Sequence, residues 1–142
     1  IRDQCPNSGY AFFSASSFDR VSGLLKDSLR YDYNKNPALI PPMIWLDSIP
    51  PAPPVLTVAP AGNTAKLKWQ VSNPKKEPLR YVVYRFVNGE PVNLERSDRI
   101  LSIQQGVEFT DPQAKLFKQC TYIVTALDRL WNERKPSNRV NL

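Results

Sequence analysis

The side chains that could act as nucleophiles, general bases or metal ligands form no familiar set in this chain. Its 142 residues include no histidine and two cysteines, Cys5 and Cys120. Catalytic triads and dyads that depend on histidine are therefore unavailable, as are the usual His/Cys zinc sites. A Cys5–Cys120 disulfide would need an oxidising compartment, and two cysteines this far apart in sequence are more often unpaired.

The carboxyl groups of residues 1–53 come from five aspartates, with no glutamate among them. Catalysis by paired carboxyl groups needs two of them held across one bond, and nothing in the spacing pairs these aspartates. Asp47 is the nearest candidate for a site residue, but a capping or packing role explains it better. The chain also lacks a Gly-rich phosphate loop. We therefore expect a chain that is not itself an enzyme and that binds no cofactor or metal.

Large apolar side chains in turns are the remaining candidates for function. Leu130 and Trp131 occupy a turn where small polar residues are usual, and Met43 and Trp45 lie in a proline-rich stretch. Such unpartnered apolar residues predict an interaction surface. Two readings of Trp131 stay open: an exposed ring on which a sugar could stack, with Trp45 as the next such ring, or a ring packed against a neighbouring strand or domain.

The net charge of +6 is unevenly distributed along the chain. Residues 1–53 balance five basic side chains with five aspartates, whereas residues 54–142 carry 14 basic and eight acidic ones. The cations fall mostly at outward strand positions and in turns, which favours a solvated surface over a nucleic-acid site. No stretch of about 18 apolar residues predicts a membrane span, and no signal peptide is visible at the start.

The pattern of residues 54–142 is that of an all-β domain. In 64–71, for example, Leu67, Trp69 and Val71 alternate with polar residues, as expected for a strand with one face in a core. Asn88-Gly89 is a strong turn signal. Short strands are expected at 55–58, 64–71, 79–87, near 91–94 as an edge strand, and at 100–103, 107–110, 121–126 and 139–142, the last two forming a hairpin.

The spacing Leu116…Tyr122-x-Val-x-Ala-x-Asp, together with Trp69 and the YVVYRF run, resembles a fibronectin type III domain over about residues 54–142. That fold is an immunoglobulin-like sandwich of about seven strands. The resemblance makes Tyr122, Leu116 and Trp69 structural residues. It implies that the Tyr122 hydroxyl bonds to upstream backbone in a tyrosine corner.

Residues 1–47 predict a different kind of structure. GYAFF at 9–13 has strand propensity, and an amphipathic helix is expected from Ser16 to about Tyr33, ending before Asn36-Pro37. Residues 37–54 contain seven of the 14 prolines, so they should be extended. The apolar residues among the prolines favour a segment packed on a domain surface over a solvated ligand, with 48–53 as the linker.

Taken together, GYAFFSASSF, PALIPPMIWLD and the fibronectin-like module resemble the C-terminal end of bacterial glycosyl-hydrolase-like family 10 proteins, which are common in Bacteroides-type bacteria. The resemblance implies that residues 1–47 are the last strand and helix of a (β/α) barrel, followed by a fibronectin type III-like domain at 54–142. No catalytic residue of the family can be placed on this chain.

The function that this resemblance implies is that of an accessory, non-catalytic region of a glycoside hydrolase, which packs against or positions the catalytic barrel of its own parent chain. Carbohydrate binding through Trp131 or Trp45 is the alternative. Nucleic acid is not an expected partner. A fragment could form a homodimer through residues 1–47, and the resemblance implies an extracytoplasmic location.

Overall fold

The structure, a computed structural model, describes residue 16 and residues 23–72, 78–133 and 135–142. It divides into two compact units, residues 1–36 and 37–142, which are described separately. In the first unit, helix α2 (Leu24–Ser28) continues into a π-helical turn, η1 (Leu29–Tyr33), which Asn34 closes by donating its N–H to the Leu29 carbonyl. The helix thus ends where expected, but its last turn is wider than an α-helix. The strand expected at 9–13 and Cys5 lie outside the described residues.

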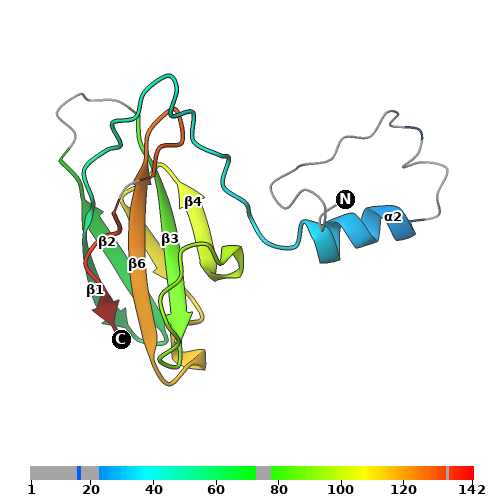
Figure 1. Ribbon diagram of the computed structural model, residues 1–142. Helices are drawn as coiled ribbons and strands as arrows, with labels where there is room; N and C mark the ends of the chain where they lie inside the picture. Colours follow the sequence, from blue (N-terminus) through cyan, green and yellow to red (C-terminus); the bar gives the residue numbers. More distant parts are fainter. Residues whose placement is uncertain (1–15, 17–22, 73–77, 134) are drawn as a thin grey trace. The chain divides into compact units, whose positions relative to one another are not determined.

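The second unit is a sandwich of two antiparallel sheets (Figure 1). The first sheet has the order β1-β2-β5, formed by Val55–Ala61, Thr64–Gln70 and Glu108–Asp111. The second has the order β4-β3-β6-β7, formed by Ile100–Gln104, Arg80–Val87, Cys120–Leu127 and Val140–Asn141. The seven-stranded sandwich predicted for residues 54–142 is confirmed.

The core between the sheets contains the apolar residues that alternate along the strands. In β2, Leu67 and Trp69 are buried while Lys66 and Lys68 face solvent. Trp69 packs edge-to-face on Tyr81 of β3, with 5.5 Å between the ring centroids. Burial of large side chains from both sheets supplies most of the driving force for closing such a sandwich.

The second sheet is buried on its outer face as well. Tyr84, Phe86 and Ile123 form a second apolar cluster there, together with Val82 and Leu127. This cluster is covered by Leu39 of the Pro-rich segment (residues 37–54), by Trp131 and by residues of the β3–β4 loop. Strands β3 and β6 are therefore nearly continuous in apolar residues, as strands buried on both faces are.

The edge strand expected near residues 91–94 does not form, which corrects the sequence interpretation. The Asn88-Gly89 turn is present, with both residues at positive φ. The chain after it is irregular up to a 3-10 turn, η2 (Ser97–Arg99). Pro91 has no N–H for a ladder. Asn93 accepts the N–H of Glu95 through its side chain, and this local bond replaces a strand partner.

A buried polar cluster joins the two sheets around Asp111, the last residue of β5. Its carboxylate, 2% exposed as a residue, accepts the Tyr122 hydroxyl at 2.8 Å and Nη1 of Arg85 at 2.8 and 2.9 Å. Its Oδ1 also accepts the backbone N–H of Gln113. Tyr122 is thus buried and satisfied as the corner predicts, but its acceptor is this side chain rather than backbone.

Leu116 does not contribute to the corner. It ends the 3-10 turn η3 (Ala114–Leu116) and its side chain is 73% exposed, because Ala114 of that turn is the residue that faces the core. Cys120 is a buried free thiol whose Sγ lies 3.5 Å from the Ala114 carbonyl. Burial raises the pKa of this thiol, which makes it a poor nucleophile.

Asp111→Asn should lower the free energy of unfolding by about 3–5 kcal/mol, because it leaves the Arg85 guanidinium, whose side chain is only 11% exposed, without its counter-charge. Urea denaturation of the two proteins measures this loss. Glu108→Gln is the matched control: it removes a carboxylate three residues earlier that pairs with Lys68 at 3.1 Å in an exposed position. That substitution should change stability by less than about 1 kcal/mol. Equal losses in the two variants would contradict the role given to Asp111.

The buried tyrosines predict a loss of stability at alkaline pH. Burial raises the pKa of Tyr81, Tyr84 and Tyr122, with the Glu133 charge adding to the effect at Tyr84 and the Asp111 hydrogen bond at Tyr122. In the unfolded chain these phenols ionise near pH 10, so the unfolded state releases protons that the native state keeps, and stability should fall as pH rises above about 10. Absorbance at 295 nm should show at least two of the six tyrosines, Tyr84 and Tyr122, ionising only on unfolding.

Candidate interaction surface

The carboxylate of Asp128 organises the β6–β7 loop (residues 128–133). Its Oδ1 accepts the N–H groups of Leu130 and Asn132 at 2.7 and 2.9 Å, and its Oδ2 accepts the Asn132 side-chain amide at 2.9 Å. Both Asp128 and Asn132 are buried. A short polar side chain that bonds the backbone two and four residues ahead is a standard way to hold a tight loop. The loop therefore has one well-defined shape.

Trp131, the best-placed candidate ring in the sequence, is packed rather than free at a loop tip. It is half-buried against the second apolar cluster, and the Arg80 guanidinium lies 5.1 Å from its ring centroid. Its φ of 64° is unusual for a bulky residue. The bonds to Asp128 on either side and the packing of the ring offset this backbone strain. Of the two readings left open for Trp131, packing is the one that the structure shows.

The β6–β7 loop also binds the Pro-rich segment. The side-chain amide of Asn132 donates to the Asp47 carbonyl at 2.8 Å, and the N–H of Met43 donates to the Leu130 carbonyl at 3.0 Å. Figure 1 shows the two stretches of chain side by side at one end of the sandwich. Leu39, which precedes Met43 in the segment, packs on the second apolar cluster. These contacts hold residues 39–47 on the sandwich.

Asp47 has a structural role in this arrangement. Its carbonyl is the acceptor for Asn132, and its Oδ1 accepts the N–H of Ile49 at 2.8 Å, which fixes a turn. Asp128 and Asn132 are the residues that sequence reasoning missed. Asp128 is the last residue of the Tyr122-x-Val-x-Ala-x-Asp spacing, but nothing in that spacing shows that the loop after it reaches a segment 85 residues away.

Anchoring the Pro-rich segment leaves a set of large apolar side chains facing outward. We call this set the apolar strip; its exposed fractions run from 48% for Ile40 to 75% for Trp45, and its other members are Ile44, Leu46 and Ile49. Met43, between them in sequence, is turned partly inward. Exposed apolar residues in this number, on backbone that is held in place, are typical of a surface that binds another protein surface.

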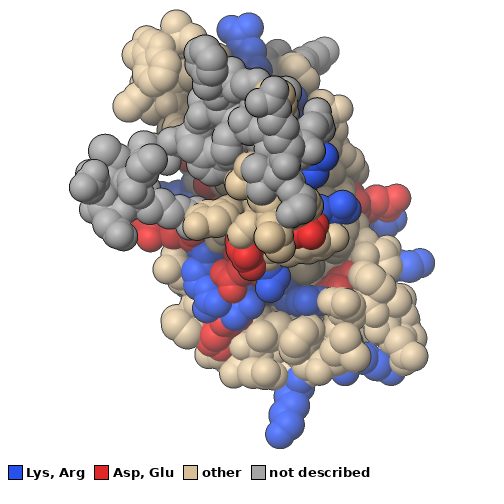
Figure 2. All heavy atoms as spheres, turned by 90° about the vertical axis from the view of Figure 1, so that its right-hand side faces the viewer, with Lys and Arg blue, Asp and Glu red and all other residues tan. Residues whose placement is uncertain are grey.

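Charged side chains form pairs and small networks rather than a single-sign field. Arg96 and Arg99 of the β3–β4 loop both bind Glu90 and Asp98, at 2.7–3.3 Å. On the face shown in Figure 2, lysines and arginines are interspersed with aspartates and glutamates. Within the described ranges, no three His, Cys, Asp or Glu side chains are grouped as a metal site would require. None of the helices described is long and apolar enough to cross a membrane.

Comparisons with known proteins link the chain to a carbohydrate-active enzyme and to fibronectin type III domains. It is 38% identical over 135 residues to the glycosyl hydrolase YngK of Bacillus subtilis, a match that covers 92% of this chain and 26% of that protein. The chain thus spans about a quarter of its curated relative. No family model matches the sequence.

Among solved structures, the fibronectin type III domain of the human fibronectin type III domain containing protein 3 superposes with a TM-score of 0.55 at 16% identity, over 67% of this chain and 86% of that one. An Fn3-like protein from Clostridium thermocellum superposes with a TM-score of 0.45 at 21% identity, over 67% and 91% of the respective chains. At such identities the first of these shows the fold alone. The chain therefore has a fibronectin type III-like fold.

Asn132→Ala should release the Pro-rich segment from the sandwich, because it removes the donor to Asp47 and one of the bonds to Asp128. We expect a loss of about 1–2 kcal/mol in the free energy of unfolding. Faster hydrogen exchange at the Met43 amide, whose acceptor Leu130 lies in the same loop, is the local measurement. Asn141→Ala serves as the control, since Asn141 accepts only the exposed Thr121 hydroxyl in β6. Unchanged exchange at Met43 would mean that Asn132 does not hold the segment.

Proposed function

We propose that this chain is a non-catalytic accessory region of a glycoside hydrolase similar to the family 10 glycosyl-hydrolase-like proteins. Its fibronectin type III-like sandwich packs against the catalytic barrel of the same parent chain and positions it. The observation that carries the proposal is the anchored Pro-rich segment with its outward apolar strip. The 38% identity to part of a glycosyl hydrolase supports the enzyme class proposed for the parent.

The physical basis is the stiffness of the connection. A linker free in solution would let two domains rotate independently, whereas seven prolines and two hydrogen bonds to the β6–β7 loop restrict residues 37–54. The orientation of a preceding domain relative to the sandwich is therefore restricted. Burial of the apolar strip against that domain would add the stabilisation that a flexible tether lacks.

The catalytic groups belong, on this proposal, to the parent's barrel. The sandwich offers packing surface rather than a reacting pair of carboxyl groups, and glycoside hydrolysis needs such a pair. Export from the cytoplasm is part of the same proposal, because polysaccharide substrates are met outside it.

Binding of carbohydrate is the second candidate function, and Trp45 is the residue that favours it. Its ring is 75% exposed, whereas Trp131 is packed beneath Arg80. A flat exposed ring on a fixed backbone can stack on a sugar. This role and the docking role compete for the same side chain, so one pair of variants distinguishes them.

The double substitution Ile44→Ser/Trp45→Ser should uncouple the barrel from the sandwich in the parent protein. Calorimetry should show the two domains unfolding as one transition in the unaltered parent and as two in the variant. In a chain of residues 37–142 alone the same substitutions should change stability by less than about 0.5 kcal/mol, since both side chains are exposed there. Val55→Ser, also at an exposed apolar position, is the control in the parent. A single transition in all three parent proteins would overturn the docking proposal.

The enzymatic part of the proposal is tested by sugar release from a panel of polysaccharides and bacterial wall glycans. Activity is expected in the parent and absent from this chain. Activity in this chain alone would refute an accessory role. Isothermal titration of the chain with the same glycans tests the second candidate: binding that Trp45→Ala removes and Trp131→Ala retains would support it over docking.

A further inference from the structure

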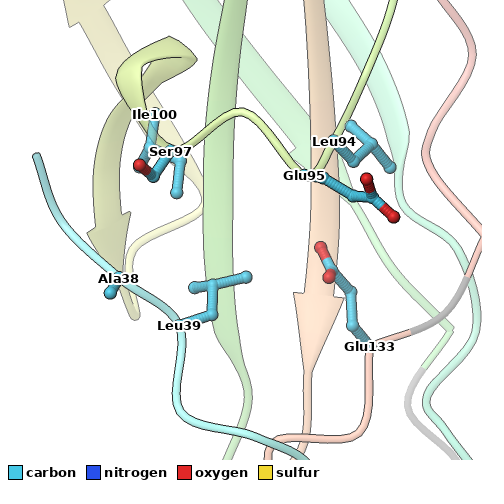
Figure 3. Close-up of a pocket in the computed structure, with 7 residues that line it drawn as sticks. All are labelled: Ala38, Leu39, Leu94, Glu95, Ser97, Ile100 and Glu133. Atoms are coloured by element: carbon cyan, nitrogen blue, oxygen red, sulfur yellow. The ribbon is translucent and has the colours of Figure 1, made fainter. Parts of the chain in front are cut away.

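A groove of about 380 Å³ lies beside the second sheet, and no member of the apolar strip lines it. It is formed by three segments: the Pro-rich segment, the β3–β4 loop and the β6–β7 loop (Figure 3). Its aliphatic walls are Leu39, Leu94 and Ile100, with Ala38 beside them. Its polar groups are the Ser97 hydroxyl and the carboxylates of Glu95 and Glu133.

The aliphatic walls are held in place by the fold. Leu39, Leu94 and Ile100 are all packed against the second apolar cluster on the outer face of β3 and β6. The backbone at Glu95 is fixed by the Asn93 side chain at 2.9 Å. A preformed site loses less conformational entropy when it binds a ligand.

The two carboxylates lie at one end of the groove, Glu95 above on the β3–β4 loop and Glu133 below on the β6–β7 loop (Figure 3). The Tyr84 hydroxyl, 3.3 Å from Glu133 Oε1, orients one of them. The two arginines nearest to Glu95 in sequence, Arg96 and Arg99, are engaged by Glu90 and Asp98 instead. The described lining residues therefore combine aliphatic walls with two carboxylates and no cation.

This combination selects the chemistry of an occupant. Among the described residues that line the groove there is no aromatic ring, so stacking on a sugar is not favoured. A lysine side chain fits better, because its four-carbon stem can lie along aliphatic walls while its ammonium group reaches charged acceptors. That ammonium can donate to both carboxylates, Glu95 and Glu133, which lie near one another in Figure 3.

We propose that this groove binds a lysine side chain presented by a polypeptide partner, with the ammonium between Glu95 and Glu133 and the stem against Leu39, Leu94 and Ile100. The site uses no residue of the apolar strip, although Leu39 is next to Ile40 in sequence, and it does not depend on the proposed accessory function. Specificity for lysine comes from the negative charge of the two carboxylates and from the length of stem that the aliphatic walls can cover.

The test is a titration of the ¹⁵N-labelled chain with the acetylated, amidated pentapeptide Gly-Gly-Lys-Gly-Gly, followed by NMR at low salt. Amide signals of Glu95, Ser97 and Glu133 should shift and saturate at millimolar peptide. The same peptide with norleucine in place of lysine keeps the stem and removes the charge, and it should leave these signals unchanged. Raising the salt concentration should weaken binding of the lysine peptide.

Three variants locate the site. Glu95→Gln and Glu133→Gln should each weaken binding by roughly two- to fivefold, the range that one exposed ion pair contributes, and glutamine at 133 can still accept the Tyr84 hydroxyl. Glu108→Gln removes the same charge from the other sheet and should leave binding unchanged.

Three results would overturn the proposal. Equal shifts with the norleucine peptide would show an apolar groove without charge selection. An equal effect of Glu108→Gln would show non-specific attraction. Saturable shifts of the same amides with calcium chloride, but not with the lysine peptide, would show a metal site instead.

Discussion

The two sheets of the sandwich are joined at one end by a single buried carboxylate, that of Asp111. A charge at 2% exposure is tolerated only when its lone pairs are used, and here a guanidinium, a phenol and a backbone N–H use them. The donors come from β3, from β6 and from the turn after β5. Each strand must therefore be in register before the carboxylate is satisfied, so the cluster couples the pairing of strands within a sheet to the packing between sheets.

The second constraint is that the outer face of the second sheet is apolar. Val82, Tyr84 and Phe86 point away from the main core, and a two-layer sandwich would leave them in water. The Pro-rich segment and the β3–β4 loop bury them instead. Residues 39–47, which are held on the sandwich, are therefore part of the structure of the domain rather than a simple linker. Leu39 of the Pro-rich segment and Trp131 of the β6–β7 loop both pack on that cluster, and the hydrogen bond from Asn132 to Asp47 joins the same segment and loop.

Much of the sandwich could be predicted from the sequence because period-two alternation and turn residues are local signals. The strands at 64–71 and 79–87, the Asn88-Gly89 turn and the burial of Tyr122 and Trp69 all follow from neighbours within a few residues. The failures are non-local. A strand near 91–94 is excluded by bonds from Asn93 and by packing on a distant cluster, and Leu116 faces solvent because its 3-10 turn presents Ala114 to the core.

The candidate surface was harder to predict for the same reason. Exposure of Trp131 could not be judged from the sequence, because it depends on a positive φ imposed by Asp128 and on a cluster built from two other strands. Trp45 is the second residue after the anchored Met43. Its ring stays exposed because the hydrogen bonds of Met43 to Leu130 and of Asn132 to Asp47 hold the backbone on either side of it. The loop that buries one tryptophan thus fixes the other in an exposed position. Binding through Trp45 should therefore be lost when the β6–β7 loop is disrupted, even though no residue of that loop need touch the partner.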